Sequence, residues 1–131
     1  RAVAYAIKKL GGKACIFNRT VANAKIIANK YGFAYSQLNS ECVSELDLYS
    51  DIIIQTTSVG AGYYGPSNEK NDPIYFYNFK GNESVYDIIY SPEVTPMMAR
   101  AKAAGCKVSN GYSMLRHQGY KQFKLFTGVD Y

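Results

Sequence analysis

The sequence predicts an α/β domain in which a mostly parallel sheet is flanked by helices. Short apolar runs typical of buried strands alternate along the chain with amphipathic segments of helical period. Three β-branched residues, Ile52-Ile53-Ile54, stand side by side rather than at alternate positions. This pattern is typical of a parallel strand that is covered on both faces.

Five runs have the composition of strands, and four segments have the apolar spacing of helices. The strand-like runs are 13–18, 33–36, 51–56, 85–90 and 106–109. The helical segments are 1–10, 20–31, 95–104 and 111–127. Residues 41–48 fit either a short helix or a turn, and residues 60–73 form the one long loop.

Each predicted helix is bounded by residues that favour its ends. Thr20 is expected to cap the second helix, and Thr95 with Pro96 is expected to start the third. A glycine follows every helix, where a left-handed conformation closes the last turn. These glycines are Gly11, Gly32, Gly105 and Gly128.

Length and composition restrict the class of protein. At 131 residues the chain has the size of one domain. No apolar run is long enough to span a membrane, and the basic residues behind the net charge of +5 form no nucleic-acid motif. The three cysteines form no Cys-x-x-Cys pair, so we expect a cytoplasmic protein without a metal site.

Four strand ends carry small polar residues or glycine. They are Asn18-Arg19-Thr20, Gln55 to Gly60, Asp87 to Pro92 and Asn110-Gly111. Because the carboxyl ends of parallel strands meet at one edge of a sheet, we expect these residues to line one crevice. Arg19 has two interpretations. It is either a solvated turn residue beside a helix cap, or a ligand for the 2′-phosphate of NADP, which an Arg at this strand end accommodates.

The same strand ends carry a family resemblance. The motifs at these positions are Asn-Arg-Thr at 18–20, Thr-Thr-Ser-Val-Gly at 56–60, Val-Tyr-Asp-x-x-Tyr-x-Pro at 85–92, Thr-Pro at 95–96 and Asn-Gly-x-x-Met-Leu-x-x-Gln at 110–118. Together they resemble the C-terminal NADP-binding domain of shikimate dehydrogenase. The match is collinear from Arg1 to Gly128. It implies that residues 1–131 form one partial NADP-binding Rossmann-like domain. The parent would be an oxidoreductase that reduces 3-dehydroshikimate to shikimate with NADPH in aromatic amino-acid biosynthesis. The parent is either monofunctional or fused to a dehydroquinate dehydratase.

The resemblance also implies roles for individual residues. Asn18, Arg19 and Thr20 would hold the adenosine 2′-phosphate; Thr56, Thr57, Ser58, Val59, Gly111 and Met114 would contact the rest of the cofactor; and Tyr90, Gln118 and Gln122 would contact the substrate. The chain departs from the family pattern at three positions. Asn23 stands where a basic residue is common, Gln55 replaces a frequent Asn, and Ala61 replaces a Met.

The family's catalytic Lys and Asp belong to an N-terminal substrate domain to which nothing in this chain corresponds. We therefore expect no catalysis from the chain alone. Asp87 is expected to orient loop backbone, and His117 cannot share a helix face with its neighbour Gln118. The first strand and Gly-rich turn of a Rossmann unit are also missing. Because that strand is central, we expect exposed sheet edges that pair with another chain or with an upstream segment.

Two alternatives stay open on the sequence. A quinate/shikimate dehydrogenase that uses NAD is one, although Arg19 argues against NAD. A non-catalytic nucleotide-binding module is the other. On the last helix, Leu115, Gln118, Gln122 and Phe126 form one stripe, whose two amides either face the crevice or bond backbone carbonyls and water.

Overall fold

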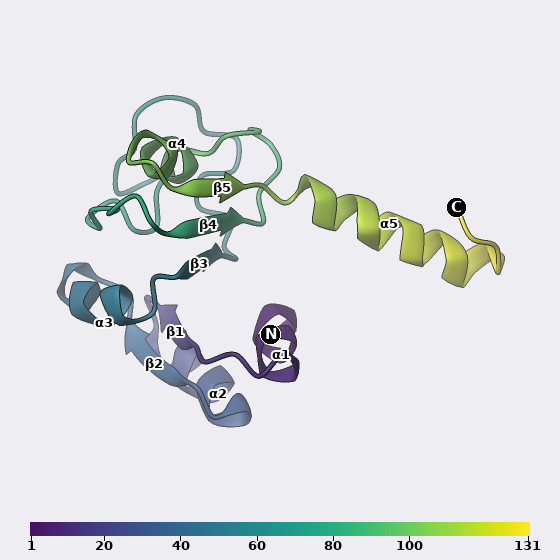
Figure 1. Ribbon diagram of the computed structural model, residues 1–131, viewed down its shortest axis with the longest axis horizontal. Coiled ribbons are helices and arrows are strands. Elements are labelled where there is room, and N and C mark those ends of the chain that lie inside the picture. Colours follow the sequence, from purple (N-terminus) through teal and green to yellow (C-terminus); the bar gives the residue numbers. More distant parts are fainter. The chain divides into compact units, whose positions relative to one another are not determined.

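Helices and strands alternate along the chain, as the apolar pattern predicts (Figure 1). The computed structural model describes residues 1–131. The chain divides into two compact units, residues 1–50 and residues 51–131.

Unit 1 is built around two parallel strands. Its elements are α1 (Ala2–Lys9), β1 (Cys15–Asn18), α2 (Val21–Tyr31), β2 (Ala34–Gln37), the 3₁₀ helix η1 (Ser40–Cys42) and α3 (Val43–Leu48). Cys15 pairs with Ala34 at one end of the strands, and Asn18 pairs with Gln37 at the other. The ambiguous residues 41–48 therefore fold into parts of two short helices.

The inner face of α2 is made of alanines. Ala24 and Ala28 are one turn apart and fully buried, and α2 packs against both β1 and β2. Small side chains at these positions bring the helix close to the strands. The helix ends as predicted at Gly32, whose φ of 72° is the left-handed conformation that glycine favours.

Unit 2 contains a three-stranded parallel sheet. Its elements are β3 (Ile52–Gln55), β4 (Ser84–Asp87), α4 (Pro96–Ala103), β5 (Lys107–Ser109) and α5 (Tyr112–Thr127). The strand order is β3-β4-β5, and α4 packs on β4 and β5. Thr95 caps α4 as predicted, because its hydroxyl oxygen accepts a bond from Met98 N–H at 3.3 Å and Pro96 occupies the first turn.

Within each unit, the strands that pair are neighbours in the dinucleotide-binding strand order. In the dinucleotide-binding order 3-2-1-4-5-6, the second strand pairs with the third, and the fourth, fifth and sixth are neighbours. If β1 to β5 take the second to sixth places, this order yields the two sheets that are observed. The predicted α/β class with parallel strands and flanking helices is confirmed.

Two local expectations differ from the structure. Thr20 stands at the N-cap position of α2, but its side chain makes no capping hydrogen bond. Ile52 is 61% exposed, so β3 is not covered on both faces along its whole length.

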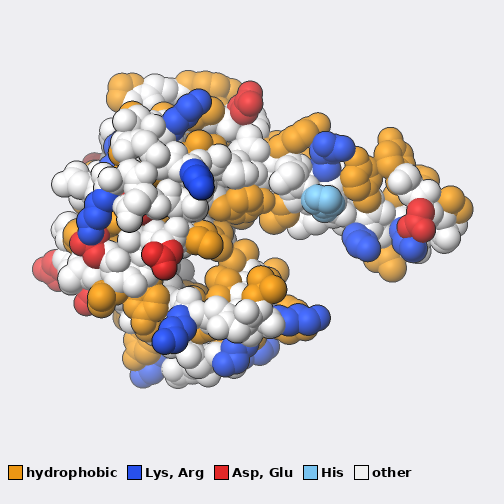
Figure 2. Space-filling model, in the orientation of Figure 1, with side chains coloured by type: hydrophobic (Ala, Val, Ile, Leu, Met, Phe, Trp, Pro, Cys, Tyr) orange, Lys and Arg blue, Asp and Glu red, His pale blue; other side chains and the backbone are white.

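The last helix, α5, has no buried residue, and Figure 2 shows apolar and basic side chains exposed along it.

No helix in the chain combines the length and the apolar character needed to cross a membrane.

Residues 56–83 contain neither helix nor strand, but they end at a buried carboxylate, Glu83. Its two oxygens accept bonds from the N–H groups of Lys80 and Gly81, both at 2.8 Å, and from Tyr77 Oη at 3.1 Å. Cys106 Sγ lies 3.2 Å from the same group. Burial alone would raise the pKa of Glu83, but the backbone N–H groups and the thiol lower it to about 2.

Replacement of Glu83 by Gln should remove a pH-dependent part of the stability. Because its pKa falls from 4.5 to about 2 on folding, the carboxylate stabilises the fold above pH 4.5, and this contribution is lost as the pH falls towards 2. At about 1.4 kcal/mol for each pKa unit, we expect Glu83→Gln to lower the free energy of unfolding by about 3 kcal/mol at pH 7.

Urea unfolding at pH 7 and at acidic pH measures this effect. The difference between the wild type and Glu83→Gln should shrink as the pH falls towards 2. Glu69→Gln, on the exposed part of the same segment, is the matched control and should behave like the wild type. Equal stability of Glu83→Gln and the wild type at pH 7 would contradict the assignment.

Candidate functional site

The end of β1 leads directly into α2. The Asn18 side-chain oxygen accepts a bond from Thr20 N–H at 2.9 Å, which turns the chain after the strand. The Arg19 carbonyl accepts a 3.4 Å bond from the Gln37 side-chain amide at the end of β2. These contacts leave the Arg19 guanidinium exposed, without a hydrogen bond or an ion pair.

The surroundings of Arg19 favour a bound anion. The first turn of α2 has no acidic side chain, so the free N–H groups at the helix start carry partial positive charge. The Thr20 hydroxyl makes no capping bond and is open to a ligand. Lys25 adds an exposed cation further along α2. A phosphate group matches this set of donors.

Gln55 shapes the turn at the end of β3. Its side-chain oxygen accepts a short bond from Thr57 N–H, and its amide nitrogen donates to the Val59 carbonyl at 3.0 Å. The Thr57 hydroxyl oxygen accepts from Val59 N–H at 3.1 Å. These bonds hold the backbone of 55–59, while Thr56, Thr57 and Ser58 face solvent. The Gln that replaces the family's frequent Asn is therefore an internal brace of this loop.

Asp87 holds the end of β4 and is fully buried. One oxygen accepts from Ile89 N–H at 2.9 Å and lies 3.4 Å from Gln55 Nε2, and the other accepts from the Thr95 hydroxyl at 2.8 Å. Burial raises the pKa of Asp87, although the bonds from Ile89 and Thr95 oppose this rise. A carboxyl without exposed surface cannot reach a substrate, so Asp87 orients loop backbone, as the sequence indicated. Tyr90, three residues on, is exposed.

Gly111 at the end of β5 lies directly against the backbone of the β4 loop. Gly111 N–H donates to the Ile89 carbonyl at 3.1 Å. A Cβ at this position would overlap the carbonyl of Ile88, so the close approach requires glycine. Asn110 adds a bond from its side-chain amide to the Glu93 carbonyl at 3.0 Å. The ends of β4 and β5 are thereby held together.

The three predicted site residues on α5 are less enclosed. Met114 is half-buried, whereas Gln118 and Gln122 are exposed along with the rest of their stripe. Their amides have no protein partners, so neither is a buried structural amide. His117 lies edge-on to the ring of Tyr120 at a centroid distance of 6.3 Å.

The predicted site residues therefore fall into two groups. Asn18, Arg19 and Thr20 lie in unit 1 at the end of β1, and the other nine lie in unit 2. Within unit 2, the loops after β3, β4 and β5 are joined by the hydrogen bonds of Gln55, Asp87 and Gly111. These bonds bring the three strand ends of unit 2 together. That the four strand ends line one crevice stays a prediction.

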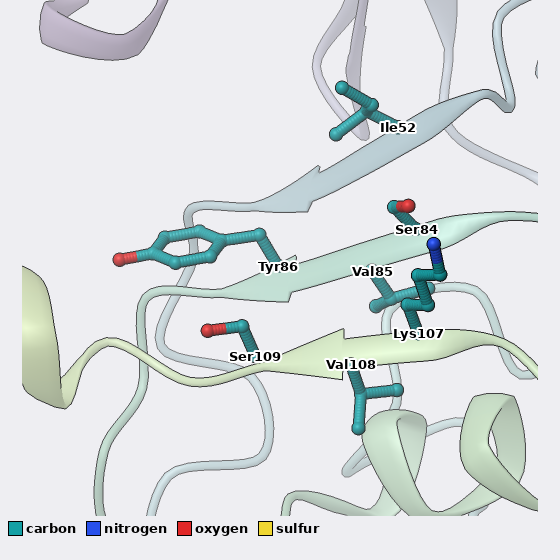
Figure 3. A pocket seen from close by; sticks show the side chains of 7 residues that line it. All are labelled: Ile52, Ser84, Val85, Tyr86, Lys107, Val108 and Ser109. Carbon is teal, nitrogen blue, oxygen red and sulfur yellow. The ribbon is translucent and has the colours of Figure 1, made fainter.

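A separate hollow of about 180 Å³ lies on the face of the unit 2 sheet (Figure 3). Its lining residues are Ile52, Ser84, Val85, Tyr86, Lys107, Val108 and Ser109. Figure 3 shows Tyr86 and Ser109 on one side of the sheet and Val108 on the other. The hollow is smaller than the roughly 300–1,000 Å³ of ligand sites and is not formed by the strand-end loops. We assign it no ligand.

Sequence reasoning did not identify Gln55 and Thr95 as members of the polar network. In the sequence, Gln55 stands out as a departure from a motif and Thr95 as a helix cap. For Gln55 the signal is a polar side chain at the end of an apolar run, since such a side chain needs partners when the strand end is buried. Thr95 stands at no strand end, and its sequence signal is that of a helix cap. No group of three or more His, Cys, Asp or Glu side chains is placed to hold a metal ion.

Comparisons with known proteins confirm the family resemblance. No family model matches the chain. The shikimate dehydrogenase (NADP(+)) of Exiguobacterium sp. is 40% identical over 114 residues, which are 87% of this chain and 40% of that protein. The enzyme of the same name from Bartonella henselae is 37% identical over 133 residues, covering 98% of this chain and 44% of that protein.

Solved structures give the same result for the fold. A crystal structure of a shikimate dehydrogenase in complex with NADP+ matches 98% of this chain and 45% of its own, with a TM-score of 0.75 and 31% identity. Quinate dehydrogenase from Corynebacterium glutamicum in complex with NAD matches 98% of this chain and 46% of its own, with a TM-score of 0.74 and 25% identity. The chain thus spans less than half the length of each of these proteins.

Proposed function

Because this chain is a homologue of NADP-dependent shikimate dehydrogenases over nearly its whole length, we propose that it is the NADP-binding part of such an enzyme. The whole protein would reduce 3-dehydroshikimate to shikimate with NADPH. A substrate domain outside this chain would supply the residues that transfer the proton to or from the substrate. Asp87 is too deeply buried to take that role.

The observation that carries this proposal is the position of Arg19. It follows β1 directly, stands at the start of α2, and has an unpaired guanidinium. A guanidinium can bind phosphate through two parallel hydrogen bonds. Together with the Asn18 side chain, the Thr20 hydroxyl and the helix N–H groups, it would hold the 2′-phosphate that distinguishes NADP from NAD.

The loops of unit 2 would hold the other end of the cofactor. Thr56, Thr57, Ser58 and Val59 would present hydroxyl and backbone groups to it, and Gly111 with Met114 would border the nicotinamide. When bound, the nicotinamide supplies or accepts the hydride. The braces at Gln55 and Asp87 would keep these loops in place before the cofactor arrives.

Three exposed side chains would recognise the substrate. Tyr90 carries a phenol hydroxyl beside the nicotinamide loops, and Gln118 and Gln122 carry amides on α5. Shikimate and its 3-keto partner bear hydroxyl and carboxylate groups, which pair with such donors and acceptors. The partner-free amides of α5 are consistent with this role.

A quinate/shikimate dehydrogenase that uses NAD is the second candidate, and the NAD complex of a quinate dehydrogenase shares the fold. Arg19 argues against it, because an Asp or Glu at this strand end is the usual partner of the ribose hydroxyl of NAD. A non-catalytic nucleotide module is not favoured, since the relatives are dehydrogenases.

Two further properties belong to the same proposal. The three cysteines are free thiols, which fits a cytoplasmic protein. β3 pairs on one side only, and an unpaired strand edge is a site for pairing with another strand. We propose that this edge pairs with a further strand of the whole protein or with a second copy of the chain.

Removal of the Arg19 guanidinium should change the choice of cofactor. A charge-assisted bond contributes about 1.5–3 kcal/mol, and about 1.4 kcal/mol corresponds to a factor of ten. In the whole protein, Arg19→Ala should therefore weaken NADP binding by roughly 10–100-fold and leave NAD binding nearly unchanged. Titration with each cofactor measures this, with Lys30→Ala at the far end of α2 as the control. Equal losses for both cofactors would contradict the assignment.

Removal of the Gln118 amide should affect the substrate and spare the cofactor. In the whole protein, Gln118→Ala should raise KM for shikimate or lower kcat at least several-fold, with NADPH binding intact, because one polar contact to the substrate is lost. Gln122→Ala should act in the same direction and less strongly. His117→Ala is the control and should leave turnover unchanged. Unchanged turnover with a lower melting temperature in Gln118→Ala would make the amide structural.

A further inference from the structure

Arg100 of α4 gathers a long irregular segment, residues 66–79, which we call the backing segment. Its Nε donates to Asp72 Oδ2 at 3.0 Å, and its Nη2 lies 2.9 Å from the same oxygen. Nη2 also donates to the Ile74 carbonyl at 2.8 Å, and Nη1 donates to the Tyr77 carbonyl through a short bond. The guanidinium carbon lies 4.9 Å from the centre of the Phe79 ring.

Asp72 links the Arg100 guanidinium to the first part of the backing segment. It is fully buried. One carboxylate oxygen accepts from the Ser67 hydroxyl at 2.7 Å, and the other accepts from Ile74 N–H at 2.9 Å. Arg100 is its only ion-pair partner. Without Arg100, the fold would contain a buried carboxylate with no balancing cation and two carbonyls without their donors, which strongly disfavours this conformation.

The neighbouring residue, Asn71, connects the backing segment to the loop after β3. Its side chain is buried and bonded to Asn68 N–H at 2.8 Å and to the Pro66 carbonyl at 3.0 Å. Its backbone carbonyl lies only 3.0 Å from the point where a Cβ on Gly60 would stand. Gly60 has a φ of 102°, a conformation that other residues rarely adopt. The end of the loop therefore rests on the backbone that Arg100 and Asp72 hold.

Gly60 closes the loop that the proposed function assigns to the cofactor. The Val59 carbonyl before it is held by Gln55, on the strand side of the turn. On the other side, the loop is backed by Asn71, together with Thr95 at 3.6 Å from the same Cβ position. The loop thus has two supports, one from its own strand and one from a segment that α4 holds.

We propose that Arg100 is a positioning residue for the cofactor loop Thr56–Gly60, acting through Asp72 and the backbone of Asn71. The inference rests on the proposed function, because it takes this loop as the contact for the nicotinamide end of NADP. Arg100 itself touches no part of the proposed cofactor site. Its planar fork reaches one carboxylate and two carbonyls together, which an ammonium group cannot reproduce.

The test compares two ligands in the whole protein. NADPH needs both the Arg19 end and the loop after β3, whereas adenosine 2′,5′-bisphosphate needs only the Arg19 end. We would measure dissociation constants of both ligands for the wild type, Arg100→Met and Arg100→Lys, well below the melting temperature of each. Lys102→Met, an exposed cation on the same helix, is the matched control.

In Arg100→Met, the dissociation constant for NADPH should rise at least threefold, and that for adenosine 2′,5′-bisphosphate should stay within twofold of the wild type. Arg100→Lys should also raise the ratio of the NADPH constant to the adenosine 2′,5′-bisphosphate constant. This variant therefore tests the proposal even if Arg100→Met does not fold. A lower melting temperature with an unchanged ratio in Arg100→Lys would make Arg100 purely structural and overturn the proposal. A wild type that binds neither ligand would instead overturn the proposed function.

Discussion

Asp87 sits fully buried at the end of β4 and accepts hydrogen bonds from the backbone of its own loop and from the cap of α4. Gln55 at the end of β3 shares the same carboxylate. An unsatisfied buried acceptor would be costly, so the chain segments around it have little freedom to move apart. The candidate site of unit 2 depends on this shared acceptor, because the exposed loop residues are placed by backbone that it holds.

Two buried carboxylates of unit 2 respond to burial in opposite ways. Burial raises the pKa of Asp87, whose bonds from Ile89 and Thr95 only partly oppose it. Glu83 is also buried, but N–H groups of Lys80 and Gly81 and a thiol stabilise its charged form and lower its pKa to about 2. Ionisation of Glu83 therefore favours folding, whereas ionisation of Asp87 opposes it. The bonds to Glu83 outweigh the effect of its burial, whereas burial of Asp87 outweighs the effect of its bonds.

Local sequence signals were sufficient for most elements and insufficient for the contacts between them. Thr95-Pro96 and Gly32 marked helix ends correctly, because a cap is determined by neighbouring residues. The run Ile52–Ile54 predicted a strand correctly but not the exposure of Ile52, since coverage depends on what packs against a strand. The bond between Arg100 and Asp72 joins residues 28 positions apart. No local sequence pattern predicts such a contact, because its partners come together only when the chain folds.

The central claim of the proposed function is that the Arg19 guanidinium at the end of β1 binds the 2′-phosphate of NADP. A crystal structure of the whole protein grown with NADP+ tests it most directly. We expect the 2′-phosphate within hydrogen-bonding distance of the Arg19 guanidinium and the Asn18 side chain, with the nicotinamide against the 56–60 loop and Gly111. A phosphate bound away from Arg19, or a nicotinamide that does not touch the loop after β3, would contradict it.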